Sequence, residues 1–152
     1  MSPFSQLPRA PIAPLLLGGA GLIPFLALAI LLLSGASEAI GVKPEAARVA
    51  LATYGAIIAS FLGGIRWGSA LGRSDGRAAL DYGLSVAPSL LAWACLALPR
   101  PWDLAALGGL ILAWGLVDQD LVRRGVAPGW FGALRLALSG GAGLSLVAAS
   151  LV

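Results

Sequence analysis

The sequence predicts an all-α integral membrane protein, a bundle of five transmembrane helices. Three observations predict it: 59% of the 152 residues are hydrophobic, only 11% are charged, and the charges lie in the gaps between apolar runs. A soluble domain averages about 25% charged residues, and a run of about 20 apolar residues is long enough to cross a bilayer. Because the gaps are short, we expect a single transmembrane domain over residues 1–152.

The apolar runs and the turn residues between them place the helices. Two runs contain an internal proline, Pro24 and Pro88, which membrane helices tolerate when neighbours satisfy the freed carbonyl groups. The fourth run has a short apolar core, so we expect Asp118 and Asp120 at its end. The expected helices cover about residues 11–33, 47–71, 79–98, 103–122 and 130–152.

The distribution of basic residues predicts the orientation. Five spans put the two termini on opposite sides of the membrane. With the N-terminus inside, more basic residues lie on the inner side than on the outer side, which favours a cytoplasmic N-terminus by the positive-inside rule. The inner residues are Arg9, Arg73, Arg77, Arg123 and Arg124, and the outer ones are Lys43, Arg48 and Arg100.

The composition argues against several classes of function. The chain has no histidine, and its one cysteine, Cys95, cannot form an intrachain disulfide or a zinc site, so we expect no metal and no cofactor. The net charge of +3 is spread over the loops, so we expect no nucleic-acid partner. No nucleophile elbow, phosphate-binding loop or His-Glu-x-x-His motif occurs, and we predict that the protein is not an enzyme.

The stretch from Tyr54 to Gly68, inside the second helix, has the most informative pattern. At 100° per residue, small residues occupy one half of the helix and bulky residues the other. In lipid, small residues let two helix backbones approach closely, and this packing holds the helices together. We therefore predict that the small half packs against two neighbouring helices, with a partner interface as the alternative. The helix-packing motif is Gly55, Ala59, Gly63, Gly64 and Gly68.

Arg66 and Trp67 lie on the same small half, near the end of the helix. An unpaired arginine at the bilayer centre costs roughly 2.5–3.5 kcal/mol, and less near the interface, so Arg66 needs a partner or a wet cavity. In an antiparallel bundle, the ends of the second and fourth helices lie beside the starts of the third and fifth. This arrangement predicts an ion-pair or ligand layer with aromatic side chains above it. Its members are Arg66, Trp67, Asp81, Asp118 and Arg135, with Asp120 and Arg124 slightly further out.

Three interpretations of this layer stay open. It is a structural network that fixes the register of the helices, a site for an anionic ligand, lipid headgroup or quinone, or part of a proton or ion path. In the second case, Trp67, Trp93 and Trp114 would line a space for a flat cofactor such as a tetrapyrrole, although bulk packing is the simpler interpretation of these side chains. The acids lie at helix ends, unlike the midplane acids of pumps.

The string Tyr54-Gly-Ala-Ile-Ile-Ala-Ser-Phe-Leu-Gly-Gly-Ile-Arg-Trp-Gly68 resembles the signature of a multi-pass membrane family of unknown function, typified by transmembrane protein 69. The segment 21–25, Pro88 and Trp93 fit the same family, and the resemblance covers most of the chain. It implies a membrane protein without an established activity, with Gly63, Gly64, Arg66, Trp67 and Gly68 as motif residues. The segment 127–131 also has a weaker similarity to the tryptophan-rich sensory (translocator) proteins.

We predict a non-enzymatic small subunit or assembly partner of a larger inner-membrane complex, with a bioenergetic complex as the candidate. The alternatives are a ligand-binding helical bundle for a lipid, quinone or tetrapyrrole, and a small transporter. We expect the protein in the lipid bilayer of a bacterial inner membrane, with a membrane-complex partner or a homo-oligomer as its assembly.

Overall fold

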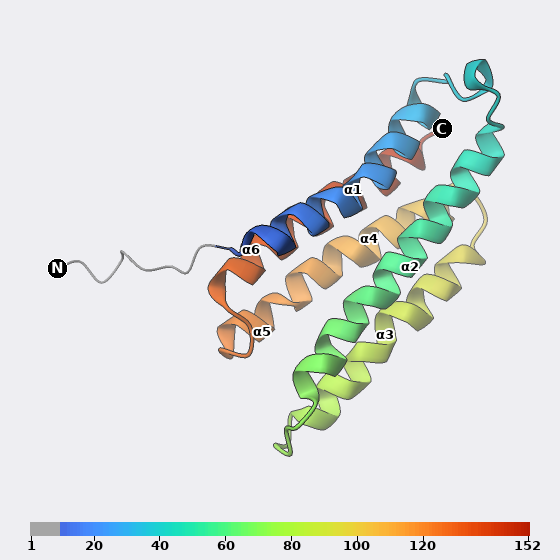
Figure 1. Cartoon of the computed structure of the whole chain (residues 1–152). Coiled ribbons are helices and arrows are strands. Elements are labelled where there is room, and N and C mark those ends of the chain that lie inside the picture. The colour runs from blue at the N-terminus through green and yellow to red at the C-terminus, as the bar shows by residue number, and fades with distance from the viewer. Residues whose placement is uncertain (1–9) are drawn as a thin grey trace.

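The computed structural model describes residues 10–152, and every regular element in this range is a helix (Figure 1). The elements in chain order are α1 (Ile12–Leu33), the short 3-10 helix η1 (Glu38–Ile40), α2 (Pro44–Ala70), α3 (Ala78–Leu96), α4 (Trp102–Val117), α5 (Gln119–Arg123) and α6 (Gly129–Ala149). Five spans are long and apolar enough to cross a membrane: α1, α2, α3, α4 together with α5, and α6. The predicted five-helix bundle is thus confirmed. Arg9, which entered the orientation argument, lies outside the described residues.

The fourth predicted helix, residues 103–122, is not continuous. The α-helical hydrogen bonding stops at Val117 and resumes at Gln119, with Asp118 as the turn residue between α4 and α5. In a continuous α-helix, the N–H of Leu121 would donate to the carbonyl of Val117. Here it donates instead to the carbonyl of Asp118 at 3.1 Å. The break therefore frees one carbonyl group inside the bundle, and it does so beside the predicted charged layer.

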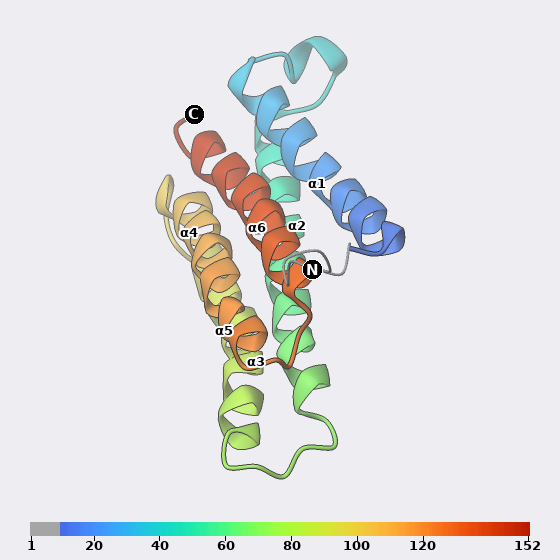
Figure 2. The same ribbon diagram turned by 90° about the vertical axis from the view of Figure 1, so that its left-hand side faces the viewer.

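The helices run alternately up and down, and α6 packs beside α4 while α3 packs beside α2 (Figures 1 and 2). α1 lies against α6 and α2. The start of α1, the α2–α3 connection and the α5–α6 connection share one end of the bundle, and the C-terminus lies at the other end with the α1–α2 connection (Figure 1). This arrangement brings the ends of α2 and α4 to the starts of α3 and α6.

Two left-handed glycines turn the chain at the charged end. Gly72 follows the last residues of α2 with φ of +79°, and Gly125 follows α5 with φ of +69°. Glycine adopts this conformation without the steric cost that a Cβ atom brings, and it commonly ends helices in this way. Gly72 lets the following residue, Arg73, fold back toward the bundle, and Gly125 turns the chain directly after Arg124.

Two rows of small residues run along α2 at four-residue spacing. The row that faces the bundle, the inner ladder, consists of Gly55, Ala59 and Gly63, and it packs as predicted. Gly55, Ala59 and Gly63 are buried. A Cβ atom at Gly63 would overlap the Ser85 carbonyl oxygen of α3, and one at Gly55 would lie 2.8 Å from the Leu107 side chain of α4. The closeness of α2 to α3 therefore depends on the missing side chain of Gly63.

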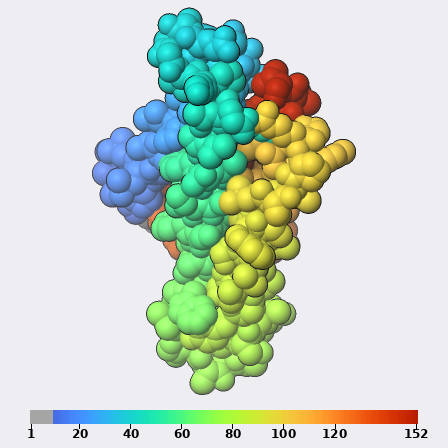
Figure 3. Space-filling view, turned by 90° about the vertical axis from the view of Figure 1, so that its right-hand side faces the viewer, coloured from blue at the N-terminus to red at the C-terminus, as the bar shows by residue number. Residues whose placement is uncertain are grey.

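The second row of small residues on α2, the outer ladder, consists of Ala56, Ser60, Gly64 and Gly68. Only Ala56, which is half-buried, packs against the core, which corrects the prediction for Gly64 and Gly68. Gly64, Gly68 and Ser60 are exposed. A Cβ atom added at either glycine would meet no described atom within 4 Å. Figure 3 shows α2 running along the surface between α1 and α3. The two ladders are displaced by 100° around the helix. The four neighbours of α2 cover the side with the inner ladder and leave most of the outer ladder open.

Candidate functional site

Arg66 is completely buried near the end of α2 and makes three kinds of contact. Its Nη1 lies 3.0 Å from Asp81 Oδ1 on α3, and its Nε lies 3.1 Å from Asp118 Oδ1 between α4 and α5. Its Nη2 donates at 2.7 Å to the carbonyl oxygen of Val117, the group freed by the helix break. The Arg66 guanidinium thus joins α2 to α3 and to the junction of α4 and α5. Two of its three acceptors, the Asp118 carboxylate and the Val117 carbonyl, lie at the helix break.

Asp81, at the start of α3, accepts hydrogen bonds from three arginines. Besides Arg66, it receives Nη1 of Arg73 at 2.9 Å and both terminal nitrogens of Arg124 at 2.9 and 3.1 Å. The carboxylate is almost fully buried. Bidentate arginine pairs of this kind are strong and geometrically specific, so Asp81 ties both inter-helix turns to the bundle.

The carboxylate of Asp118 is shared between α2 and α6. Its Oδ1 accepts from Arg66, and its Oδ2 accepts from Nε of Arg135 at 2.8 Å. Asp118 is completely buried and Arg135 is 5% exposed. A single buried carboxylate between two guanidinium groups is electrostatically satisfied, but each guanidinium has only part of a counter-charge here.

The outermost charges of the layer compensate the outer arginines. Asp75 pairs with Arg73 at 2.7 Å, and Asp120 lies 2.8 Å from Arg124 Nε. The side-chain hydrogen bond from Arg73 is the main reason that the pKa of Asp75, in the α2–α3 turn, is held below its ordinary value. The same pairing raises the pKa of Arg73, so both groups stay charged at neutral pH.

The tryptophans do not form the aromatic layer that the sequence predicts above Arg66. Trp67 is 49% exposed and packs edge-on against Tyr82, with ring centroids 4.9 Å apart, on the outside of the α2–α3 pair. Trp93 is 75% exposed. Only Trp114 is buried among the three tryptophans considered. They form no common lined space, and the flat-cofactor interpretation of these tryptophans is wrong, because Trp67 and Trp93 lie on outward faces of their helices.

A second buried ion pair, which the sequence interpretation missed, closes the opposite end of the bundle. Arg48 of α2 is buried, and its Nη2 lies 2.5 Å from Asp103 Oδ1 in the first turn of α4. Its Nη1 donates to the carbonyls of Ala149 and Val152 at 3.4 and 3.3 Å, at the end of α6. A cation is favourable at a helix C-terminus. Arg48 was counted among the loop charges, and its spacing of seven residues from Gly55 on the buried face of α2 is the signal that would have placed it inside.

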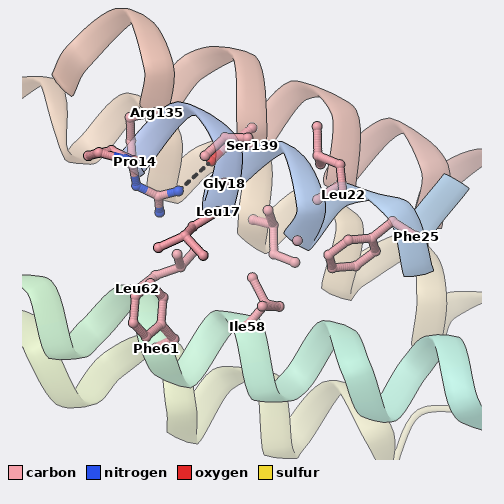
Figure 4. Close-up of a pocket in the computed structure, with 14 residues that line it drawn as sticks. Pro14, Leu17, Gly18, Leu22, Phe25, Ile58, Phe61, Leu62, Arg135 and Ser139 are labelled. Atoms are coloured by element: carbon pink, nitrogen blue, oxygen red, sulfur yellow. Dashed lines mark hydrogen bonds between the residues drawn. The ribbon is translucent and has the colours of Figure 1, made fainter. Parts of the chain in front are cut away.

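An apolar cavity of about 350 Å³ lies between α1, α2, α4 and α6 (Figure 4). Its walls are leucine, isoleucine and phenylalanine side chains, and its polar end holds Arg135 and Ser139 of α6. Nη1 of Arg135 donates to Ser139 Oγ at 3.2 Å. Nη2 of Arg135 is buried and has no hydrogen-bond partner among residues 10–152. Across the same residues, no group of three or more acidic, cysteine or histidine side chains is arranged to hold a metal ion.

The fold and these contacts define a polytopic α-helical membrane protein whose spans are joined by buried ion pairs near both ends. The chain belongs to the family described as "Protein of unknown function (DUF3429)", whose model matches residues 10–151. It is similar to "Transmembrane protein 69" of Xenopus tropicalis, with 38% identity over 148 residues that cover 95% of this chain. The chain spans 56% of the length of that relative. No solved structure matches the chain.

The family confirms the resemblance that the Tyr54–Gly68 string predicts. Within that string the structure separates the motif residues into two groups. Gly63 and Arg66 face the bundle, whereas Gly64, Trp67 and Gly68 face outward. The motif thus combines an internal packing and ion-pair function with an outer surface that nothing in residues 10–152 covers.

Proposed function

We propose that the chain is a non-enzymatic small subunit or assembly partner of a larger inner-membrane complex, and that the outer ladder of α2 is its docking face. The ladder consists of Ala56, Ser60, Gly64 and Gly68, at four-residue spacing. The observation that carries the proposal is the open space over Gly64 and Gly68, on a helix whose other small residues, Gly55 and Gly63, pack closely against neighbouring helices. The proposed occupant is a transmembrane helix of another protein.

The inner ladder of the same helix is the internal precedent for this occupant. There, Gly55 and Gly63 admit side chains and backbone of neighbouring helices at contact distance. A second ladder with the same spacing and chemistry offers a helix the same close approach. The exposed aromatic rings of Phe61 and Trp67 flank it and provide apolar area for a partner.

The pairing of the charges supports a non-enzymatic function. Asp81 and Asp118 are each held by two or more arginines, and Asp75 and Asp120 pair with the outer arginines. A general acid or base needs access to a substrate and a pKa near the working pH. The buried carboxylates Asp81 and Asp118, which guanidinium groups surround, do not offer access to a substrate, and they are suited to fixing helix positions instead.

We also propose that the N-terminus lies on the cytoplasmic side of a bacterial inner membrane. The end of the bundle with the start of α1 carries Arg73, Arg77, Arg123 and Arg124, whereas the other end carries Lys43, Arg48 and Arg100. The rule counts basic residues near the spans whether or not acids accompany them. In a Cys95→Ala background, an impermeant maleimide should label Ile40→Cys in intact cells and Gly76→Cys only after permeabilisation. The reverse pattern would contradict this orientation.

The docking face is tested by photo-crosslinking from position 61. A photoreactive amino acid at Phe61 should give one discrete adduct with another membrane protein, and the same group at Trp93 on α3 should not. Gly64→Leu should abolish the adduct, because it fills the open ladder. Gly109→Leu is the matched control, since Gly109 is also exposed, lies on α4 and has open space around it. Adducts only with a second copy of the chain, or an adduct unaffected by Gly64→Leu, would contradict the proposal.

One observation favours a second candidate function, a ligand-binding bundle. It is the apolar cavity with the unpartnered Nη2 of Arg135 at its end. The location differs from the space above Arg66 that the sequence suggested.

A further inference from the structure

We propose that the cavity between α1, α2 and α6 binds a single-chain anionic amphiphile, with its carboxylate or phosphate oxygen on Nη2 of Arg135 and its apolar chain between α1 and α2. The proposal does not depend on the docking face of α2, because none of the residues of the outer ladder lines this cavity; Phe61, beside the ladder, lines its edge. Its ligand class follows from the donors of Arg135, the walls of the cavity and its opening.

The donors of Arg135 leave one position for an acceptor. Nε is used by Asp118 and Nη1 by Ser139, whereas Nη2 has no partner among residues 10–152. The side chain is 5% exposed, and its guanidinium group is a cation with N–H donors only. A buried charged donor without an acceptor keeps its desolvation penalty, so an acceptor placed there is stabilising. Figure 4 shows the guanidinium projecting from α6 into the space above Leu17 and Leu62.

The local charge favours an anionic acceptor over a neutral one. Asp118 is the one carboxylate that contacts Arg135 within the described chain, and Arg66 shares it. The other carboxylates of the layer pair with Arg66, Arg73 and Arg124, and none of them lines this cavity. The cavity end of the layer therefore carries positive charge that its own acids only partly balance.

The walls select an apolar chain. They consist of Leu22 and Phe25 from α1, Ile58 and Leu62 from α2, and Ile111 from α4, with no acidic side chain among the lining residues. Ligand pockets commonly measure about 300–1,000 Å³, so a volume of about 350 Å³ suits one chain rather than two.

The cavity is open at the side because α1 and α2 diverge toward the start of α1. The two helices meet where Tyr54 Oη donates to the Gly21 carbonyl at 3.0 Å and where the tilted rings of Phe25 and Tyr54 are in contact, with centroids 4.9 Å apart. Toward the start of α1 they separate (Figure 1). Leu17 and Phe61 line the cavity and are exposed on the outside of the bundle, so a chain can enter sideways from the bilayer.

The depth of Arg135 suits a headgroup. It lies six positions after the first residue of α6, which is roughly 9 Å along the helix at 1.5 Å per residue. Pro14, near the start of α1, lines the same end of the cavity. The acidic group would thus lie close to the membrane interface and the chain would extend toward the bilayer centre.

The test measures binding of radiolabelled palmitate to the purified full chain in mild detergent, with hexadecanol as the uncharged competitor of equal chain length. We expect saturable binding that palmitate competes at least tenfold better than hexadecanol. Equal competition by the alcohol would overturn the assignment of Arg135 as an anion-binding group.

Two glycine substitutions on α1 test the location. Gly21→Leu should weaken binding at least tenfold by filling the cavity, because Gly21 lines it and a Cβ there meets only Tyr54 Oη within 4 Å. Gly19→Leu adds the same side chain on the outer face, where nothing lies within 4 Å, and should bind like the wild type. Unchanged binding in Gly21→Leu, with a normal unfolding midpoint, would overturn the proposal.

Two further measurements assign the headgroup and its source. Arg135→Gln should reduce the preference for palmitate over hexadecanol, and this ratio is read only from folded protein with a cooperative unfolding transition. A retained preference would contradict the proposal. Displacement of palmitate by lysophosphatidylglycerol, which has one acyl chain and a phosphate, would assign the site to a lysophospholipid, and its failure would assign it to a free fatty acid, both being single-chain anionic amphiphiles.

Discussion

Nε of Arg66 donates to Oδ1 of Asp118 at 3.1 Å, across 52 positions of sequence and inside the membrane-spanning bundle. Both side chains are completely buried. Asp118 also interrupts the fourth span, and the interruption gives Arg66 the Val117 carbonyl as a further acceptor. The pair therefore couples a local helix break to the packing of α2 against α4. Four predictions follow from this arrangement and from the second pair at the opposite end.

The first prediction concerns the neighbouring glycines of α2. Gly63→Ala should lower the stability by about 1–3 kcal/mol, the usual cost of overpacking, because the new Cβ overlaps the Ser85 carbonyl. Gly64→Ala should leave stability unchanged or raise it by up to about 1 kcal/mol through helix propensity. The midpoint of unfolding in mild detergent measures both. Equal midpoints for the two variants would contradict the packing of α2 on α3.

The second prediction contrasts Arg66 with Trp67. Arg66→Leu should cost about 3–5 kcal/mol, as for other broken buried pairs, and lie toward the lower end because Asp118 keeps Arg135. Trp67→Leu removes one edge contact with Tyr82, which is worth about 0.5–1.5 kcal/mol. Chemical unfolding of the two purified variants compares them. A larger loss in Trp67→Leu would show that the aromatic contact, not the charge, dominates this end.

The third prediction concerns the opposite end of the bundle. Arg48→Gln removes the pair with Asp103 and weakens the contacts with the end of α6, so we expect a loss of about 1–3 kcal/mol. Lys43→Gln, at an exposed position before α2, should have no measurable effect. Limited proteolysis of the C-terminal residues should also be faster in Arg48→Gln. Resistance equal to that of the wild type would mean that Arg48 does not hold the end of α6.

The helices could be predicted from the sequence because length and apolarity alone decide which segments span a bilayer. The partners of Arg66 could be predicted because antiparallel order brings the end of α2 to Asp81 and Asp118. The first prediction depends on length and composition, and the second on chain order and the cost of an unpaired charge, and all of these follow directly from the sequence.

The environment of Trp67 could not be predicted in the same way. Helical periodicity separates small from bulky faces, but it does not say how many neighbours a bundle provides or which arc they cover. Gly63 and Gly64 are adjacent and chemically identical, yet one touches backbone and the other faces outward. The break at Asp118 was also not predicted. The backbone stays near the helical conformation there, with no glycine or proline to mark the break, and the break appears only in the hydrogen bonds.

The central claim is that the buried charges around Arg66 act as one network joining the helices at this end of the bundle, and a double-mutant cycle on Arg66 and Asp118 tests it most directly. Arg66→Leu, Asp118→Leu and the double variant are compared by equilibrium unfolding, with Arg66→Leu and Asp103→Asn as a control cycle across the two ends. We predict that the Arg66–Asp118 double variant loses at least about 1 kcal/mol less than the sum of its single variants, whereas the control cycle is additive. Additive losses in the Arg66–Asp118 cycle, within about 0.5 kcal/mol, would contradict the network.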